Sequence, residues 1–308
     1  MCLILVREKR SERAGSGEGH NERENTMKQI VVVSGKGGTG KTVLTASFAS
    51  LARNKVMVDC DVDAADLYLL LKPEIRERYE FRSGVTARID KDICQECGEC
   101  ISVCRFEAIS QDFVVDPVSC EGCTVCSHIC AADAIIMEEN VSGEWYISET
   151  KYGALVHAKL GIAEENSGKL VAKVRQIAKG IADKEKKDYV IIDGPPGIGC
   201  PVIAALSGVD LALIVTEPTL SGMHDMERVA QVSKHFGIPT KVVINKYDLN
   251  LKNSEAVKKI CEQAGMEVVA LLPFSRQVSE SIVQGIPLVE YSKNGITCDI
   301  TQLWERIK

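Results

Sequence analysis

Short runs of apolar residues recur along the chain, and longer stretches with helical spacing separate most of them. The first run, at 30–33, is continuous and β-branched, which is typical of a strand buried on both faces. Similar runs follow at 56–58, 189–192, 211–215, 241–244 and 268–272. Apolar residues at helical spacing occupy 43–53, 169–184 and 223–236. This alternation predicts an α/β fold, a doubly wound and mostly parallel sheet with helices on both faces.

The stretch at 89–146 breaks this rhythm. It holds two short cysteine runs that repeat with a period of 26 residues, from Cys94 to Cys120, and each run is followed by a similar apolar tail. We therefore expect a small α+β domain inserted into a discontinuous larger one, which would comprise 27–88 and 147–308.

Each cysteine run reads C-x2-C-x2-C-x3-C, the spacing of a bacterial two-cluster ferredoxin. The fourth cysteine of each run serves the other cluster in such proteins. The spacing thus assigns one [4Fe–4S] cluster to Cys94, Cys97, Cys100 and Cys130, and the other to Cys104, Cys120, Cys123 and Cys126. Zinc is the alternative, because it favours paired C-x2-C knuckles. Two complete four-cysteine runs favour the clusters. Arg105 and Ala131 stand where the ferredoxin pattern usually has proline.

A phosphate-binding loop lies upstream of both cysteine runs. It consists of Gly35, Lys36, Gly37, Gly38, Thr39, Gly40, Lys41 and Thr42, and it satisfies G-x4-G-K-[ST]. The loop follows a predicted strand and opens a predicted helix, so backbone amides and the helix N-terminus can meet phosphate oxygens. The motif predicts that Lys41 reaches the β- and γ-phosphates and that Thr42 binds magnesium.

The early lysine, Lys36, makes the loop more specific. The sequence Lys-Gly-Gly-Thr-Gly-Lys-Thr resembles the deviant loop of the MinD/Mrp/nitrogenase iron-protein class of ATPases. The early lysine of that class crosses to the nucleotide of a partner subunit. The resemblance therefore implies a homodimer in which Lys36 acts in catalysis and hydrolysis depends on dimerisation.

Two acidic segments resemble the switch regions of the same class. Residues 58–63 resemble its first switch, which implies that Asp61 polarises the attacking water and that Asp59 assists around magnesium. Residues 192–197 resemble the Walker B strand and second switch. By that resemblance Asp193 holds a magnesium-bound water and the Gly197 amide meets the γ-phosphate.

Residues 244–248 resemble the base-recognition segment, with Asn245 contacting the purine. The base is usually adenine in this class, but Asn-Lys-x-Asp also resembles the guanine-reading motif of GTPases, so both nucleotides stay open. The resemblance covers nearly all of residues 27–308. It is closest to MinD-like ATPases that carry an inserted ferredoxin domain.

The composition of the chain limits the kinds of partner and cellular location that we expect. The net charge of −6 among 308 residues argues against nucleic acid. Thirteen cysteines without a secretory signal indicate metal ligands in a reducing cytosol, hence a cytoplasmic protein. No run approaches the roughly 20 apolar residues of a membrane span. We expect residues 301–308 to end the last helix without stable membrane association, and residues 1–26 to be a disordered extension, with Met27 as an alternative start.

The combined expectation is a magnesium-dependent ATPase, slow without a partner, that binds ATP or ADP and two clusters. Three roles remain open. The first is ATP-gated electron delivery to a redox or metallocofactor-assembly protein. The second is an iron–sulfur cluster carrier of the Mrp type, which the lack of a later C-x2-C pair after Cys130 weakens. The third is a MinD-like positioning or regulatory switch with redox-sensing clusters.

Overall fold

The computed structural model describes residues 27–161 and 167–308. Its centre is one nine-stranded sheet with the strand order β3-β4-β5-β2-β6-β1-β7-β8-β9. The strands are β1 Lys28–Ser34, β2 Lys55–Asp59, β3 Glu74–Ile89, β4 Ile135–Thr150, β5 Gly153–Leu160, β6 Tyr189–Pro196, β7 Leu211–Thr216, β8 Thr240–Asn245 and β9 Glu267–Leu272. All strands from β5 to β9 in this order run parallel, whereas β3 and β4 are antiparallel additions at one edge. The predicted α/β, mostly parallel sheet is confirmed.

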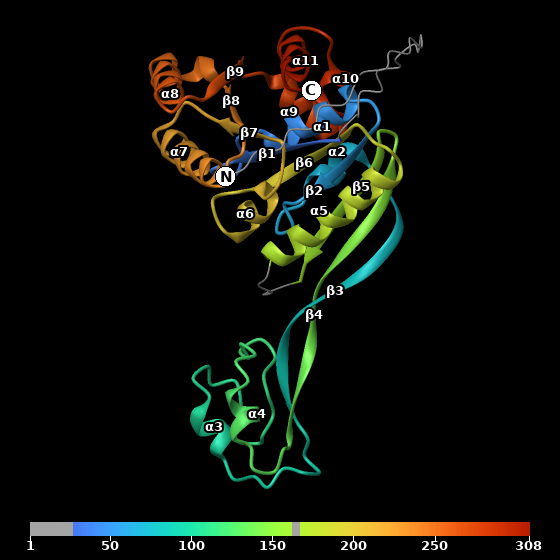
Figure 1. The fold of residues 1–308 in the computed structure, drawn as a ribbon, viewed down its shortest axis with the longest axis vertical. Coiled ribbons are helices and arrows are strands. Elements are labelled where there is room, and N and C mark those ends of the chain that lie inside the picture. The colour runs from blue at the N-terminus through green and yellow to red at the C-terminus, as the bar shows by residue number, and fades with distance from the viewer. Residues whose placement is uncertain (1–26, 162–166) are drawn as a thin grey trace, which may run out of the picture.

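Helices cover both faces of the parallel part (Figure 1). One face carries α1 Lys41–Leu51, α2 Leu67–Leu71, α9 Arg276–Gln284, α10 Leu288–Tyr291 and α11 Ile296–Ile307. The other carries α5 Ser167–Lys184, α6 Cys200–Leu206, α7 Leu220–His235 and α8 Leu251–Gln263. Each face has its own apolar core because the strand side chains alternate between the two faces. We call these two layers and the sheet between them the body.

The sequence pattern of the helices explains which side of each is buried. In α5 the buried residues Leu170, Val174, Ala178 and Ala182 recur at four-residue spacing, so one stripe faces the sheet. The predicted end of the last helix is confirmed. Trp304 of α11 is buried and its ring lies 5.3 Å from that of Phe48 on α1. No helix in the described part of the chain is long and apolar enough to cross a membrane.

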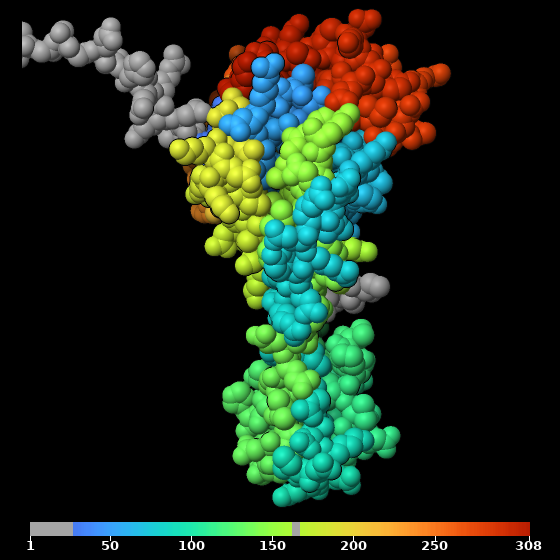
Figure 2. Space-filling view, turned by 90° about the vertical axis from the view of Figure 1, so that its right-hand side faces the viewer, coloured from blue at the N-terminus to red at the C-terminus, as the bar shows by residue number. Residues whose placement is uncertain are grey.

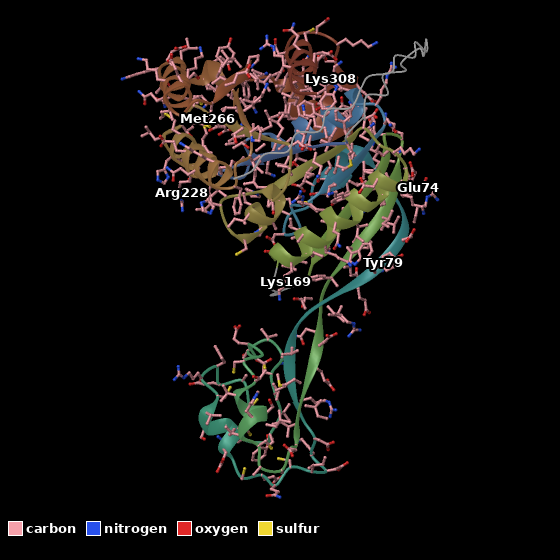
Figure 3. The ribbon with its side chains drawn as sticks, viewed as in Figure 1. Glu74, Tyr79, Lys169, Arg228, Met266 and Lys308 are labelled. Carbon is pink, nitrogen blue, oxygen red and sulfur yellow. The ribbon has the colours of Figure 1, made fainter. Side chains whose placement is uncertain are left out.

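The pair β3 and β4 forms an arm that projects from the body and ends in a small lobe at residues 90–134 (Figures 1 and 2). The lobe contains α3 Glu99–Val103 and α4 Val125–Ile129. Tyr79 lies where the arm leaves the body (Figure 3), and its ring stacks on that of Trp145 with the ring centres 4.1 Å apart. Further out, the register shifts twice between Phe81 and Val85. The arm was not predicted.

The predicted domain boundaries fall at two different places in this arrangement. Position 89 is the last residue of β3, whereas position 146 lies inside β4, close to the body. Both strands of the arm belong to the same sheet as the body. The division into two domains therefore stays a prediction, and the expected extension at 1–26 lies outside the described residues.

Candidate functional site

The carboxyl ends of the parallel strands gather the predicted nucleotide-binding residues. The phosphate-binding loop joins β1 to α1, and its Gly38 and Gly40 have φ values of 78° and 93°. Left-handed backbone favours glycine, because a Cβ there crowds the following carbonyl. A Cβ on Gly40 would also lie 2.6 Å from the Asn245 side-chain nitrogen. The loop conformation therefore requires glycine at position 40.

Three carboxylates and one ammonium group meet below this loop. Asp59 ends β2 and is the register partner of Asp193 in β6. The Lys41 Nζ lies 3.1 Å from the Asp61 carboxylate. The Asp61 amide in turn donates to Asp59 Oδ1 at 3.0 Å. All four residues are buried. The structure thus brings together four of the residues that the sequence assigned to catalysis and magnesium.

Burial and charge shift the pKa values of this group in opposite ways. Burial alone lowers the pKa of Lys41, but the Asp193 and Asp61 carboxylates outweigh it, so the pKa of Lys41 is raised. Burial raises the pKa of Asp59 well above its ordinary value, and the neighbouring Asp193 adds to that shift. Burial also raises the pKa of Asp193, while Lys41 opposes the change. Lys41 is therefore the counter-charge to the carboxylates of this group.

Hydroxyl groups and one carboxylate oxygen make this pocket suitable for a magnesium ion. The Thr45 hydroxyl donates to Asp193 Oδ1 at 3.1 Å, and the Thr42 hydroxyl also lowers the pKa of Asp193. Asp193 Oδ2 is buried and has no hydrogen-bond partner in the described part of the chain. Carboxylate oxygens and phosphate oxygens are the ligands that Mg²⁺ prefers. Asp193 and Thr42 therefore fit the predicted ion.

A cavity of about 500 Å³ adjoins the loop and has room for a nucleotide. It is lined by the loop residues Lys41 and Thr42 together with Asp61, and by apolar side chains of α2 and α9. The apolar residues on its wall include Leu69, Leu70, Pro273, Phe274, Val278 and Ile282. The wall thus offers both charged groups to a triphosphate and apolar groups to a base.

Asn245 lines the cavity at the end of β8, as predicted, but its amide already has a partner. Its Nδ2 donates to the Thr39 carbonyl at 2.8 Å, and its Oδ1 accepts from the Lys246 amide at 2.9 Å. Asp248 accepts a hydrogen bond from the Phe274 amide at 2.7 Å. In this structure the Asn-Lys-x-Asp segment therefore fixes the loop and the Phe274 backbone, and the choice between adenine and guanine remains open.

Lys36 and Gly197 lie apart from the buried charges. Lys36 Nζ is 3.4 Å from the Glu217 carboxylate and 3.3 Å from the Thr219 hydroxyl, in the segment after β7. The Gly197 amide donates to the Ser34 carbonyl at 2.9 Å. A γ-phosphate contact through Gly197 would replace that hydrogen bond.

The small lobe holds the eight predicted cluster cysteines, of which six belong to or pack against an apolar centre, whereas Cys97 and Cys123 are exposed. Cys104, Cys120, Cys123 and Cys126 line one cavity. Cys94 and Cys97 are close enough to Cys100 to add to the rise in its pKa, which burial dominates. Within residues 27–161 and 167–308, no three His, Cys, Asp or Glu side chains are placed to hold a single metal ion. Ligands of a four-iron cluster bind separate iron atoms, so their sulfurs stand further apart than those around one ion.

Two residues of the nucleotide site were missed in the sequence. Thr45 follows Lys41 by four positions, so helical spacing alone places it on the same face of α1 and toward Asp193. The sequence contains no such signal for Glu217, because this residue is far from Lys36 and Lys246 along the chain and only folding brings them together.

A glycine loop, a buried lysine and three aspartates at the carboxyl ends of parallel strands define a P-loop nucleotide-binding protein. The family model of the CobQ/CobB/MinD/ParA nucleotide binding domain matches residues 30–288. The chain belongs to that family, and it is a P-loop ATPase of the MinD type.

The chain is also similar to individual proteins, and the solved structures among them share its fold. The chain is 35% identical over 284 residues to an uncharacterised protein of Methanocaldococcus jannaschii, covering 91% of this chain and 96% of that one. The septum site-determining protein MinD of Pyrococcus horikoshii, solved with Mg-ADP, superposes with a TM-score of 0.57. It is 20% identical over 92% of this chain and 96% of its own. The MinC:MinD complex of Aquifex aeolicus gives 0.56 at 21% identity, over 91% and 95% of the two chains.

The acidic cluster predicts how a Lys41→Met variant responds to pH. Asp193 has a folded pKa above its ordinary value of 3.8, so the folded protein keeps its proton to higher pH than the unfolded chain. The contribution of Asp193 to the free energy of unfolding therefore falls as the pH rises from the unfolded pKa to the folded pKa. Without Lys41 the folded pKa of Asp193 is higher, so this pH range extends upward. We expect hydrolysis to drop by more than about a hundredfold, and the free energy of unfolding to fall by about 3 kcal/mol at pH 8 and by less at pH 5.5.

Urea titrations at the two pH values measure this effect. The matched control is Lys55→Met, which removes a buried lysine whose pKa burial lowers to about 8 and which should lose no stability at pH 8. An equal loss at both pH values in Lys41→Met would contradict the counter-charge role.

Proposed function

We propose that this ATPase carries two [4Fe–4S] clusters in its small lobe. We further propose that it uses an ATP-driven homodimer to gate electron delivery to a metalloprotein or a metallocofactor-assembly partner. The observation that carries the proposal is the single cavity lined by Cys104 of the first run and by Cys120, Cys123 and Cys126 of the second. This is the crossed set that the ferredoxin spacing assigns to one cluster.

The surroundings of the cysteines suit such clusters. Ala87, Ile89, Ile109 and Ile135 are buried around them and belong to the lobe's own apolar core. The Ala134 amide donates to Cys130 Sγ at 3.3 Å. Apolar cover and amide hydrogen bonds to sulfur are the means by which proteins set cluster potentials. Bound there, the clusters would supply one-electron redox chemistry, with Cys94, Cys97, Cys100 and Cys130 holding the first.

The homodimer part of the proposal rests on Lys36. Its Nζ contacts Glu217, Thr219 and Ser221. Among the described residues, Lys41 supplies the ammonium group that pairs with Asp61. A lysine in the phosphate-binding loop that has no contact with these buried carboxylates in the described part of the chain is available to a second subunit. Nucleotide in one subunit could therefore recruit Lys36 of the partner, which would make dimerisation depend on ATP.

A chain of main-chain contacts links the acidic site to the base of the arm. The Leu160 amide, at the end of β5, donates to the Val62 carbonyl at 3.1 Å, one residue past Asp61. Leu160 is also the register partner of Gly143 in β4. Any shift of the Asp61 segment on nucleotide binding would reach the arm through these two steps. This path supports communication between nucleotide state and the small lobe.

Cluster transfer is the second candidate function. One cysteine of each predicted ligand set, Cys97 in the first and Cys123 in the second, is exposed. An exposed thiolate ligand can be exchanged for the thiolate of an acceptor protein. This feature favours a carrier role, whereas the lack of a later C-x2-C pair in the sequence speaks against the Mrp type.

The decisive experiment separates the two candidates. Anaerobically purified protein is reduced with dithionite, washed, and mixed with MgATP and excess apo-ferredoxin, while EPR follows the clusters and iron is assayed on each protein. We expect iron to stay in place and ATP to change the cluster signal or its oxidation rate, which would indicate gated electron delivery. ATP-dependent movement of iron to the acceptor would instead identify a carrier.

Lys36→Ala tests the homodimer. We expect it to abolish ATP-dependent dimerisation and to lower hydrolysis at least about a hundredfold, because the second subunit's charge is lost at the γ-phosphate. Iron content should be unchanged. Sedimentation with a non-hydrolysable ATP analogue and a phosphate-release assay measure the two effects. Lys252→Ala, at an exposed position on α8, is the control. Normal turnover in Lys36→Ala would rule out the trans-acting lysine.

Cys104→Ser tests the crossed ligand set. We expect iron per chain to fall by about half and the surviving EPR signal to be that of the cluster held by Cys94, Cys97, Cys100 and Cys130, because only the second set loses a thiolate. ATP binding should persist. Cys298→Ser, at an exposed position in α11, serves as the control. Full iron content in Cys104→Ser would refute this ligand assignment, and zinc in place of iron in the parent protein would refute the clusters.

A further inference from the structure

Glu217 is a carboxylate shared by two lysines of the nucleotide-binding region. One of its oxygens lies 3.4 Å from Lys36 Nζ, and the other pairs with Lys246 Nζ. The Glu217 side chain is 14% exposed, whereas each lysine side chain is 32% exposed. A carboxylate that is this far buried needs a cation to balance it. The ammonium groups of Lys36 and Lys246 compete for this one carboxylate.

The segment that carries Glu217 is held rigidly. The Thr219 hydroxyl accepts from the Gly222 amide at 3.0 Å and starts α7. The Pro218 carbonyl accepts from the Asn253 side chain at 3.0 Å. A Cβ on Gly222 would lie 2.5 Å from the Glu217 carbonyl oxygen, so the turn is also tightly closed. Glu217 therefore presents its charge at a fixed place, and the flexible partner in the pair is Lys36.

We propose that Glu217 is a positioning residue that holds Lys36 within its own subunit until a second subunit's nucleotide attracts it. The inference rests on the trans-acting role of Lys36 proposed above. In the single chain, Lys36 is bound by Glu217, Thr219 and Ser221. Engaging phosphate across a dimer interface requires Lys36 to leave these contacts, so the pair with Glu217 opposes dimerisation.

Lys246 makes this release possible at low cost. Its ammonium group also lies 3.4 Å from the Gly38 carbonyl, so it is anchored beside the phosphate-binding loop. When Lys36 leaves, Lys246 still balances Glu217, and no buried charge is left unpaired. The two lysines therefore have opposite effects on dimerisation: Lys36 makes the trans contact, and Lys246 weakens the hold of Glu217 on Lys36.

Glu217→Gln tests the proposal with a change of nearly equal shape. We expect ATP-dependent dimers to form at roughly three- to tenfold lower protein concentration, because a neutral amide binds Lys36 less strongly. Sedimentation at saturating non-hydrolysable ATP analogue measures this effect. Glu255→Gln, which removes the pair with Lys258 on α8, is the control. Weaker dimerisation in Glu217→Gln would mean that Glu217 only braces the loop, and would overturn the proposal.

Lys246→Gln provides a second test with the opposite sign. Glu217 then holds Lys36 alone, so we expect dimerisation to weaken by a similar factor once nucleotide saturation is verified by titration. In the Glu217→Gln background the same change should have no further effect. If Lys246→Gln weakened dimerisation in the Glu217→Gln background as much as it does in the parent protein, the result would contradict the competition between the two lysines for Glu217. The Lys36→Ala variant separates the two proposals. Normal dimerisation in Lys36→Ala refutes the trans-acting lysine. Lost dimerisation in Lys36→Ala, together with unchanged dimerisation in Glu217→Gln, refutes only the positioning role.

Discussion

The balance between one buried ammonium group and three buried carboxylates sets the conditions for the whole nucleotide site. Asp59 and Asp193 are register partners on adjacent parallel strands, and Asp61 follows two residues after Asp59. Burial, together with the neighbouring carboxylates, raises the pKa of Asp59 and Asp193, and the Lys41 ammonium group opposes the shift at Asp193. A divalent cation with its phosphate ligands fits this excess of negative charge. The site is thus built for a ligand that brings its own cation, as Mg-nucleotide does.

The same parallel sheet connects the distant lobe to this site. Strand β2 delivers Asp59 and Asp61, β5 lies beside β2, and β4 pairs with β5 along the base of the arm. The nucleotide site and the arm are therefore separated by one strand. Close to the body the arm is braced by the stack of Tyr79 on Trp145, whereas the register shifts between Phe81 and Val85 interrupt regular pairing further out. Movement at the base would be carried rigidly to that point, and bending would be concentrated beyond it.

The sequence predicted six of the seven parallel strands of the body, because each contains a continuous apolar run, but it missed β5, where His157 and Lys159 interrupt the apolar residues. It did not predict the arm. Residues 74–82 alternate Glu and Arg around Ile75, Tyr79 and Phe81, and much of β3 is exposed, so no apolar pattern marks it. The phosphate-loop motif predicted Lys41 and Thr42 at this place, and the family resemblance implied Asp59, Asp61 and Asp193 beside them. The contacts of Lys36 with Glu217 could not be predicted, since they join segments 181 residues apart through side chains alone.

Charge gives a physical reason for placing the lobe on an arm. Residues 90–134 contain nine acidic and two basic residues, a net charge of −7, whereas the whole chain carries −6. The rest of the chain is therefore nearly neutral, and the acidity is concentrated in the lobe. A lobe with this charge beside the phosphate-binding loop would repel the incoming nucleotide. The outer arm, about eight residues of extended chain, spans roughly 25 Å, well beyond the ~8 Å Debye length at physiological salt. The arm thus lets the acidic lobe and the anion-binding site belong to one chain without electrostatic conflict.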